Sequence, residues 1–138
     1  MCEIVGVGTD LCAIPRIARA MEKAHFYLRV FLEGERAYLD ARGAARAQSA
    51  AAMFAAKEAV AKALGTGFAQ GVCAWEIEVT HDALGRPGVR LHGDAAARLE
   101  RIGGGRVLLS LTHEGDSALA FAVIEGKRPR AAREDAQE

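Results

Sequence analysis

The pattern of apolar and polar residues predicts that the first third of the chain contains one strand followed by helices. Residues 3–7 are apolar and β-branched, which is typical of a short buried strand. Behind Pro15, apolar residues recur at helical spacing and predict a helix over about 13–24. Residues 33–42 favour a second short helix.

The clearest helical pattern is an alanine-rich segment over 49–64. Ser49 is a suitable N-cap, and Gly65 lies where a C-terminal cap belongs. The segment would be about 24 Å long. It predicts a long helix near the centre of the sequence.

After this helix the period changes to two. Trp75, Ile77 and Val79 alternate with polar residues and predict a half-buried strand, with Trp75 in the core. Turn residues over 82–87 lead into a return strand that starts near Val89. This part of the chain therefore reads as a hairpin.

The last third contains a short helix and a second hairpin. The helix is expected over 94–102, with Asp94 as its cap. Strands over 107–112 and 118–125 are joined by a turn. We therefore expect one α+β domain over 1–125, in which an antiparallel sheet packs against the long central helix. The remainder, 126–138, has little to bury and is predicted to be disordered.

Charge and composition exclude several classes of protein. The 138 residues carry 18 basic and 18 acidic side chains, so no general binding to nucleic acid is expected. Three cysteines without a CxxC pair argue against a disulfide framework or a structural zinc site. No apolar run reaches about 18 residues and no signal peptide is evident, so we expect a cytoplasmic protein without a membrane anchor.

Asp10 is the first candidate for chemistry, because it follows the first predicted strand. A carboxylate at a strand end can present a metal ligand. It can equally cap the helix that follows, and taken alone the cap is favoured. The surrounding glycines match neither a Rossmann fingerprint nor a P-loop.

Phe54, Glu58 and Lys62 form the second candidate, because a spacing of four places them on one helix face. Glu58 could hold Mg²⁺ while Lys62 neutralises charge on a leaving phosphate. The alternative is a surface ion pair worth about 0.2–0.5 kcal/mol, which spacing alone favours.

Ser110, Thr112 and His113 form the third candidate, at the end of an apolar strand. Alternation places the two hydroxyls on one side, where they could bind phosphate oxygens while His113 moves a proton. The alternative is an edge strand with a solvated histidine. A serine hydrolase is poorly supported, because Ser110 lacks the Gly-x-Ser-x-Gly elbow.

The order of these motifs along the chain is more specific than any one of them. Over roughly residues 3–125 the sequence resembles holo-acyl-carrier-protein synthase, the small single-domain branch of the phosphopantetheinyl transferases. The resemblance rests on Gly8-Thr9-Asp10, Ile14-Pro15-Arg16-Ile17, Glu35, Phe54-Ala-Ala-Lys-Glu-Ala59 with Lys62, Gly65-Thr66-Gly67, Gly85-Arg86-Pro87 and Ser110-Leu-Thr-His113.

The resemblance implies Mg²⁺-dependent transfer of the phosphopantetheine arm of coenzyme A to a serine of apo acyl carrier protein, by a homotrimer with active sites at its subunit interfaces. Asp10 and Glu58 would hold Mg²⁺, and Lys62 would lie near the transferring phosphate. The serine proton would go to Glu58, to a metal-bound water or to His113. The residues expected at coenzyme A are Phe54, Lys57, Gly65, Thr66, Gly67, Pro87, Ser110, Thr112 and His113.

Arg16, Arg19 and Lys23 make the outer side of the first predicted helix basic. On sequence alone a solvated helix face is the simpler interpretation. The resemblance implies instead that Arg16 contacts the carrier protein, and a basic helix would attract an acidic carrier.

Two positions depart from the family pattern. Met53 stands where the family often has arginine, and Ala13 where it often has glutamate. These departures motivate an alternative from another class, a non-catalytic module that binds a carrier protein or coenzyme A. A third interpretation is a metal-dependent phosphate-ester hydrolase that uses the same carboxylates.

Overall fold

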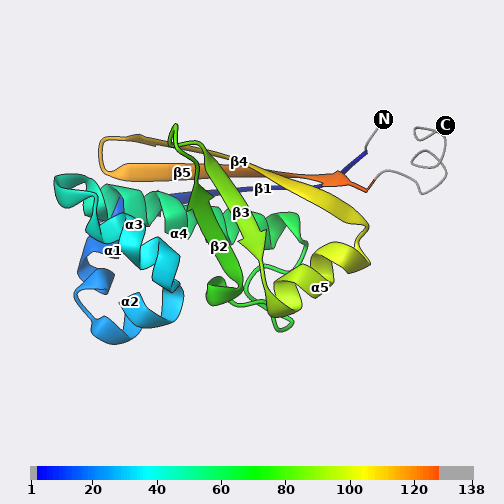
Figure 1. Ribbon diagram of the computed structural model, residues 1–138, viewed down its shortest axis with the longest axis horizontal. Coiled ribbons are helices and arrows are strands. Elements are labelled where there is room, and N and C mark those ends of the chain that lie inside the picture. Colours follow the sequence, from blue (N-terminus) through cyan, green and yellow to red (C-terminus); the bar gives the residue numbers. More distant parts are fainter. Residues whose placement is uncertain (1–2, 128–138) are drawn as a thin grey trace.

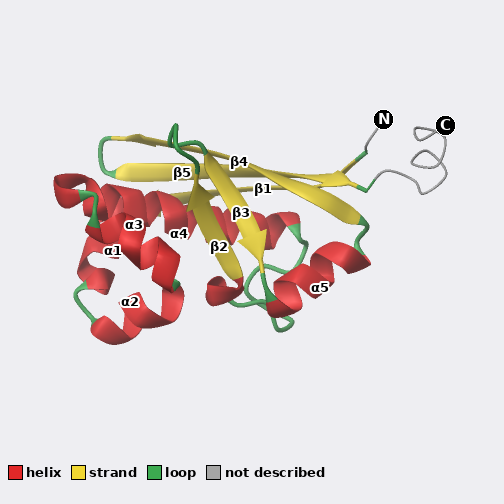
Figure 2. Cartoon of the chain, in the orientation of Figure 1, coloured by secondary structure: helices red, strands yellow, loops and turns green. Residues whose placement is uncertain are grey.

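The computed structural model describes residues 3–127 and contains two antiparallel sheets (Figures 1 and 2). The larger sheet has three strands in the order β1-β5-β4, and the smaller one pairs β2 with β3. The strands are β1 (Ile4–Ala13), β2 (Ile77–His81), β3 (Pro87–Leu91), β4 (Gly104–Glu114) and β5 (Ser117–Gly126).

The long helix α4 lies against one face of the larger sheet, and the other helices lie at the two ends of the molecule. In Figure 1, α1, α2 and α3 lie at one end of the molecule and α5 at the other. The helices are α1 (Ile14–Met21), α2 (Ala24–Val30), α3 (Glu33–Asp40), α4 (Arg46–Ala63) and α5 (Gly93–Arg101), with 3₁₀ turns η1 (Gly43–Ala45) and η2 (Ala74–Glu76). This arrangement confirms the predicted α+β fold with a long central helix.

Small residues let β1 and α4 approach each other closely. A methyl group on Gly8 would lie 1.9 Å from the carbonyl oxygen of Ala59, and one on Gly6 would lie 2.1 Å from that of Ala63. Both positions therefore require glycine, because real Cβ contacts are never this short. The strand backbone rests directly on the helix backbone.

The two faces of the larger sheet have different surroundings. Residues Gly8, Asp10 and Cys12 of β1 face α4, whereas the residues between them point away from it. The register aligns the outward positions of β1, β5 and β4 in rows. We call this surface the outer face; it comprises Val7, Thr9, Leu11, Leu108, Ser110, Thr112, Leu119, Phe121 and Val123.

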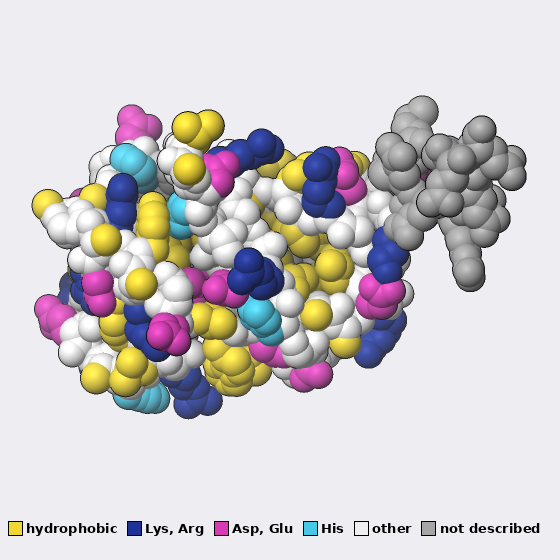
Figure 3. All heavy atoms as spheres, in the orientation of Figure 1, with side chains coloured by type: hydrophobic (Ala, Val, Ile, Leu, Met, Phe, Trp, Pro, Cys, Tyr) yellow, Lys and Arg dark blue, Asp and Glu magenta, His cyan; other side chains and the backbone are white. Residues whose placement is uncertain are grey.

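The outer face is apolar yet uncovered within the chain. Val7 is 59% exposed, Leu11 65% and Phe121 46%. Elsewhere charged residues of both signs are interspersed, as Figure 3 shows for one side of the molecule. No helix within residues 3–127 is long and apolar enough to cross a membrane.

The structure corrects several boundaries near the central helix and the first strand. β1 continues to Ala13 rather than ending at residue 7, because its pairing with β5 runs uninterrupted through Gly8 and Asp10. α4 begins at Arg46, so Ser49 lies inside the helix and does not cap it.

Further corrections concern capping and burial. Asp94 does not cap α5; the N-cap is His92, and the Asp94 amide instead donates to the Glu76 carboxylate. Trp75 belongs to η2 and is 43% exposed, so its predicted place in the core was wrong. Helix α2 was not predicted at all.

The predicted disordered segment is only partly described. Gly126 belongs to β5, and its amide donates to the Glu3 carbonyl at 2.7 Å. The Lys127 amide donates to the Gly103 carbonyl at 2.9 Å. These two residues are ordered by main-chain hydrogen bonds, and residues 128–138 lie outside the described part of the chain.

Candidate active site

Asp10 and Lys62 meet where β1 crosses the C-terminal half of α4. The Lys62 ammonium lies 3.1 Å from Asp10 Oδ1 and 3.2 Å from the Thr9 carbonyl. The N-cap of α1 is Ala13, and no side chain caps that helix. The interpretation of Asp10 as a helix cap is therefore wrong, and its carboxylate belongs to the contact between β1 and α4.

Glu58 completes this cluster. Partial burial and the nearby Asp10 carboxylate raise the pKa of Glu58, while Lys62 and Arg16 act against this rise. Two neighbouring carboxylates in a half-buried place suit a divalent cation, which would neutralise their negative charge. We call Asp10, Glu58 and Lys62 the carboxylate–lysine cluster.

The described residues do not supply a complete metal cage. No group of three or more His, Cys, Asp or Glu within 3–127 is arranged to hold an ion. Asp10 and Glu58 could hold Mg²⁺ if phosphate oxygens and water filled its other positions, which is how Mg²⁺ is usually bound. The donor set therefore fits this cation together with a phosphorylated ligand.

Arg16 lies beside the cluster rather than pointing away from it. Its guanidinium lies 3.7 Å from Cys12 Sγ and 5.9 Å from the centroid of the Phe54 ring. All three members of the basic set, Arg16, Arg19 and Lys23, are exposed. Of these, Arg16 is the one that lies at the cluster.

Pro87 and His113 line a separate pocket of about 190 Å³ with the first half of α4 and with α3. His113 Nδ1 lies 2.8 Å from Gln48 Nε2, and the rings of Tyr38 and His81 stack at 3.8 Å. No sequence pattern points to Gln48, Tyr38 and His81, because they come from separate elements that only the fold brings together.

Met53 forms part of this pocket. It is 1% exposed and lies with Ala52 and Leu111 in the wall. An apolar side chain therefore stands where the family often has arginine. Arg42 supplies a basic side chain to the same pocket.

Ser110 and Thr112 lie on the face of β4 opposite to His113, although Thr112 and His113 both line a hollow at the end of the strand. The register pairs Ser110 with Phe121 and Thr112 with Leu119 on the outer face, and His113 with Ala118 on the opposite face. The predicted coenzyme A segment is therefore divided between two faces of one edge strand.

Gly65, Thr66 and Gly67 form the turn that ends α4, directly after Lys62. The Gly65 amide donates to the Lys62 carbonyl at 2.9 Å, and the Thr66 amide donates to the Ala61 carbonyl at 3.3 Å. Gly65 has φ of 84° and Gly67 has φ of 55°. This is a Schellman-type end, which needs glycine at the left-handed position.

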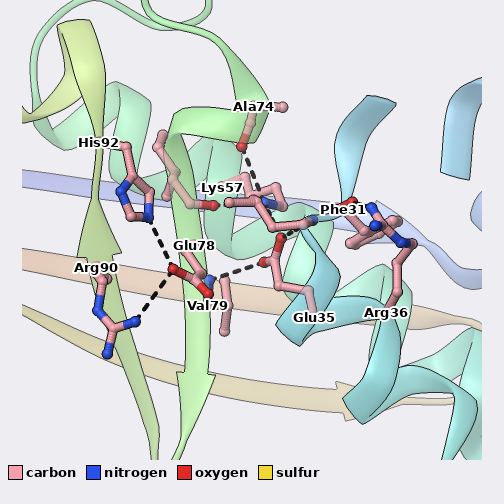
Figure 4. Close-up of polar contacts among 11 residues, drawn as sticks. Phe31, Glu35, Arg36, Lys57, Ala74, Glu78, Val79, Arg90 and His92 are labelled. Atoms are coloured by element: carbon pink, nitrogen blue, oxygen red, sulfur yellow. Dashed lines mark hydrogen bonds and ion pairs between the residues drawn. The ribbon is translucent and has the colours of Figure 1, made fainter. Parts of the chain in front are cut away.

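Lys57 lies in the core and not at a surface. Its side chain is completely buried and donates to Glu35 at 2.8 Å, to the Ala74 carbonyl at 3.0 Å and to the Ile77 carbonyl at 2.6 Å (Figure 4). Burial lowers the pKa of Lys57, and the Glu35 carboxylate acts against this. With all three N–H groups used internally, Lys57 has none for coenzyme A, and we correct that prediction.

Comparison with known proteins identifies the family of this chain. The model of the 4′-phosphopantetheinyl transferase superfamily matches residues 6–122. The chain belongs to this superfamily. It is therefore an enzyme, a phosphopantetheinyl transferase, as the sequence resemblance predicted.

Relatives support the assignment over nearly the whole chain. A holo-[acyl-carrier-protein] synthase from Methylobacterium nodulans is 54% identical over 128 residues, covering 88% of this transferase and 96% of the relative. A solved holo-[acyl-carrier-protein] synthase from Neisseria meningitidis is 37% identical with a TM-score of 0.80, covering 88% and 98%. A coenzyme A complex from Chronobacterium ammoniagenes is 32% identical with a TM-score of 0.76, covering 89% and 98%.

Proposed function

We propose that this transferase moves the 4′-phosphopantetheine group of coenzyme A to a serine of apo acyl carrier protein and releases adenosine 3′,5′-bisphosphate. The carboxylate–lysine cluster is the observation that carries the proposal. It joins two acidic groups suited to Mg²⁺ and one ammonium at a single place, next to the glycine turn that ends α4. The names of the relatives, and the coenzyme A complex among them, support the same substrates.

The reaction forms a bond between the serine oxygen and the β-phosphorus of coenzyme A, and breaks the bond from that phosphorus to the departing bisphosphate. Mg²⁺ held by Asp10 and Glu58 would offset negative charge on the pyrophosphate. Lys62, with 52% of its side chain exposed, can exchange its contact with Asp10 for a phosphate oxygen as charge develops. Glu58, a metal-bound water and His113 are the candidates to accept the serine proton.

We propose that the active site is shared between subunits of a homotrimer. The cluster lies where β1 crosses the C-terminal half of α4, whereas His113 is on β4, at the other edge of the sheet, and lines the pocket with Pro87. Among residues 3–127, no hydrogen bond or ion pair joins the two groups. A neighbouring subunit packed on the apolar outer face would supply the second group and would bury Val7, Leu11 and Phe121.

The carrier protein is proposed to dock against α1. Arg16 lies at the cluster, while Arg19 and Lys23 continue the basic surface outward. An acidic partner would be drawn to these charges and its serine directed toward Glu58.

Intact-mass measurement of an apo acyl carrier protein tests the proposed reaction. Incubation with the transferase, coenzyme A and Mg²⁺ should add about 340 Da, and EDTA should prevent the gain. A carrier with its serine changed to alanine is the substrate control, and Asp10→Asn is the enzyme control. No gain with several carriers, although the protein is folded, would favour the non-catalytic binding module instead.

A further inference from the structure

The loop that follows α4 is held at both ends by the helix α5. The loop runs over 64–73, between α4 and η2, and begins with the Gly65–Gly67 turn. In Figure 1, α5 lies near the C-terminal end of α4, on the side away from α1. Nothing in the sequence pattern connects these segments, because they lie far apart along the chain; Leu64 and Arg98 are 34 residues apart.

Arg98 of α5 holds the start of the loop. Its Nε donates to the Leu64 carbonyl at 2.9 Å, and a Cβ added to Gly65 would lie 3.3 Å from its guanidinium. Leu64 is the C-cap of α4, where carbonyls lack partners inside the helix. A cation at this end also interacts favourably with the helix dipole.

Glu76 and Asp94 hold the other end of the loop. The Glu76 carboxylate accepts a hydrogen bond from the Cys73 amide at 2.8 Å and another from the Asp94 amide in the first turn of α5. The Asp94 carboxylate lies 3.0 Å from where a Cβ of Gly71 would be. Glu76 is only 8% exposed, so these hydrogen bonds are largely protected from water.

We propose that α5 braces this loop and that Arg98 is a positioning residue for coenzyme A binding. The inference rests on the proposed function and on the expectation, from the family resemblance, that the Gly65–Gly67 turn contacts coenzyme A. Arg98 acts through main-chain atoms: by fixing the Leu64 carbonyl it sets the direction in which the turn leaves the helix. Because the turn would contact coenzyme A equally before and during transfer, its loosening should raise KM more than it lowers kcat.

Arg98→Gln and Arg98→Lys test the brace, with Arg101→Gln as the matched control. Arg101 lies on the same helix and lines a small pocket together with Arg98 and Thr66, but it makes no hydrogen bond or ion pair within residues 3–127. Arg98→Gln should raise KM for coenzyme A about tenfold and change kcat by less than about twofold. Arg98→Lys should behave similarly, because it lacks the Nε–H that Leu64 accepts, and Arg101→Gln should leave KM unchanged.

Hydrogen exchange provides a readout that does not depend on activity. In Arg98→Gln the amides of Thr66 and Gly67, both bonded to the Ala61 carbonyl, should exchange at least about tenfold faster, while amides in the middle of α4 stay protected. Equal loss of protection throughout α4 would mean a general stability effect and would overturn the positioning role.

Two kinetic outcomes would also overturn it. Normal KM in Arg98→Gln would show that the turn needs no brace. If Arg98→Lys had a normal KM, and high salt raised the KM of the wild type more than that of Arg98→Gln, Arg98 would contact coenzyme A directly through its charge. Absence of transfer by the wild-type protein would instead refute the proposed function, and the exchange experiment would still decide whether the brace exists.

Discussion

Replacing Lys57 by methionine should destabilise the fold much more than any surface substitution on the same helix. The ammonium satisfies the Glu35 carboxylate and the carbonyls of Ala74 and Ile77, so it joins α4 to α3, η2 and β2. Methionine fills a similar volume but donates no hydrogen bond. It would leave the buried Glu35 carboxylate without its positive partner and would remove one donor from each of the Ala74 and Ile77 carbonyls.

The size of the effect follows from burial. Both side chains of the pair are 0% exposed, and breaking such a pair by removing one partner costs about 3–5 kcal/mol. For a chain of this length that corresponds to a fall in Tm of about 10–20 °C. Lys62→Met is the control: the Lys62–Asp10 pair is partly exposed, so its loss should cost less than about 1 kcal/mol.

Thermal and urea unfolding at one fixed protein concentration would measure these differences. A double variant with Glu35→Gln removes the unpaired charge, so it should be about 1–3 kcal/mol more stable than the sum of the single effects predicts. If Lys57→Met cost no more than Lys62→Met, the ammonium would not hold these elements together. Strict additivity in the double variant would likewise refute the reasoning.

Four further outcomes are expected. Gly8→Ala should lower stability by at least about 1–3 kcal/mol and reduce the proposed transfer, because the new methyl group meets the Ala59 carbonyl at 1.9 Å; unfolding and activity assays would show both. In EDTA, Glu58→Gln should raise Tm above that of the wild type at pH 8, because a raised pKa means that the fold disfavours the charged Glu58 carboxylate. Near pH 4, where the carboxyl is largely protonated in the folded and unfolded chains alike, the two Tm values should converge. Lys62→Ala should lower kcat by a larger factor than it raises the Kd for coenzyme A. If kinetics and calorimetry gave equal factors for kcat and Kd, the proposed role of Lys62 at the transferring phosphate would be contradicted. Leu11→Glu should give monomers by light scattering and abolish transfer if subunits meet on the outer face; an unchanged trimer would exclude that face.

Patterns local to the chain predicted most of the elements and part of the site. The alanine-rich run and the period-two segments identified α4 and the strands, because these depend on neighbouring residues. The spacing of Glu58 and Lys62 placed both on one helix face, but spacing could not say what that face meets. Only the packing of β1 showed that it meets Asp10.

The remaining features depend on contacts between distant segments. Lys57 was assigned to coenzyme A with its motif, yet the fold turns it toward Glu35, which lies 22 residues earlier. Trp75 continued an alternating pattern, but the 3₁₀ turn that contains it breaks the alternation. Gln48 and His113 meet across 65 residues, a pairing that no local pattern contains.

The direct contact of β1 with α4 also bears on how the site can change during evolution. Gly6 and Gly8 touch carbonyls one helical turn apart, so two backbones, rather than interlocking side chains, set the spacing between Asp10 and Glu58. Core substitutions elsewhere could alter stability without moving this spacing. Substitutions in the surrounding core can therefore accumulate without separating the two carboxylates, whereas loss of Gly6 or Gly8 would change their separation directly.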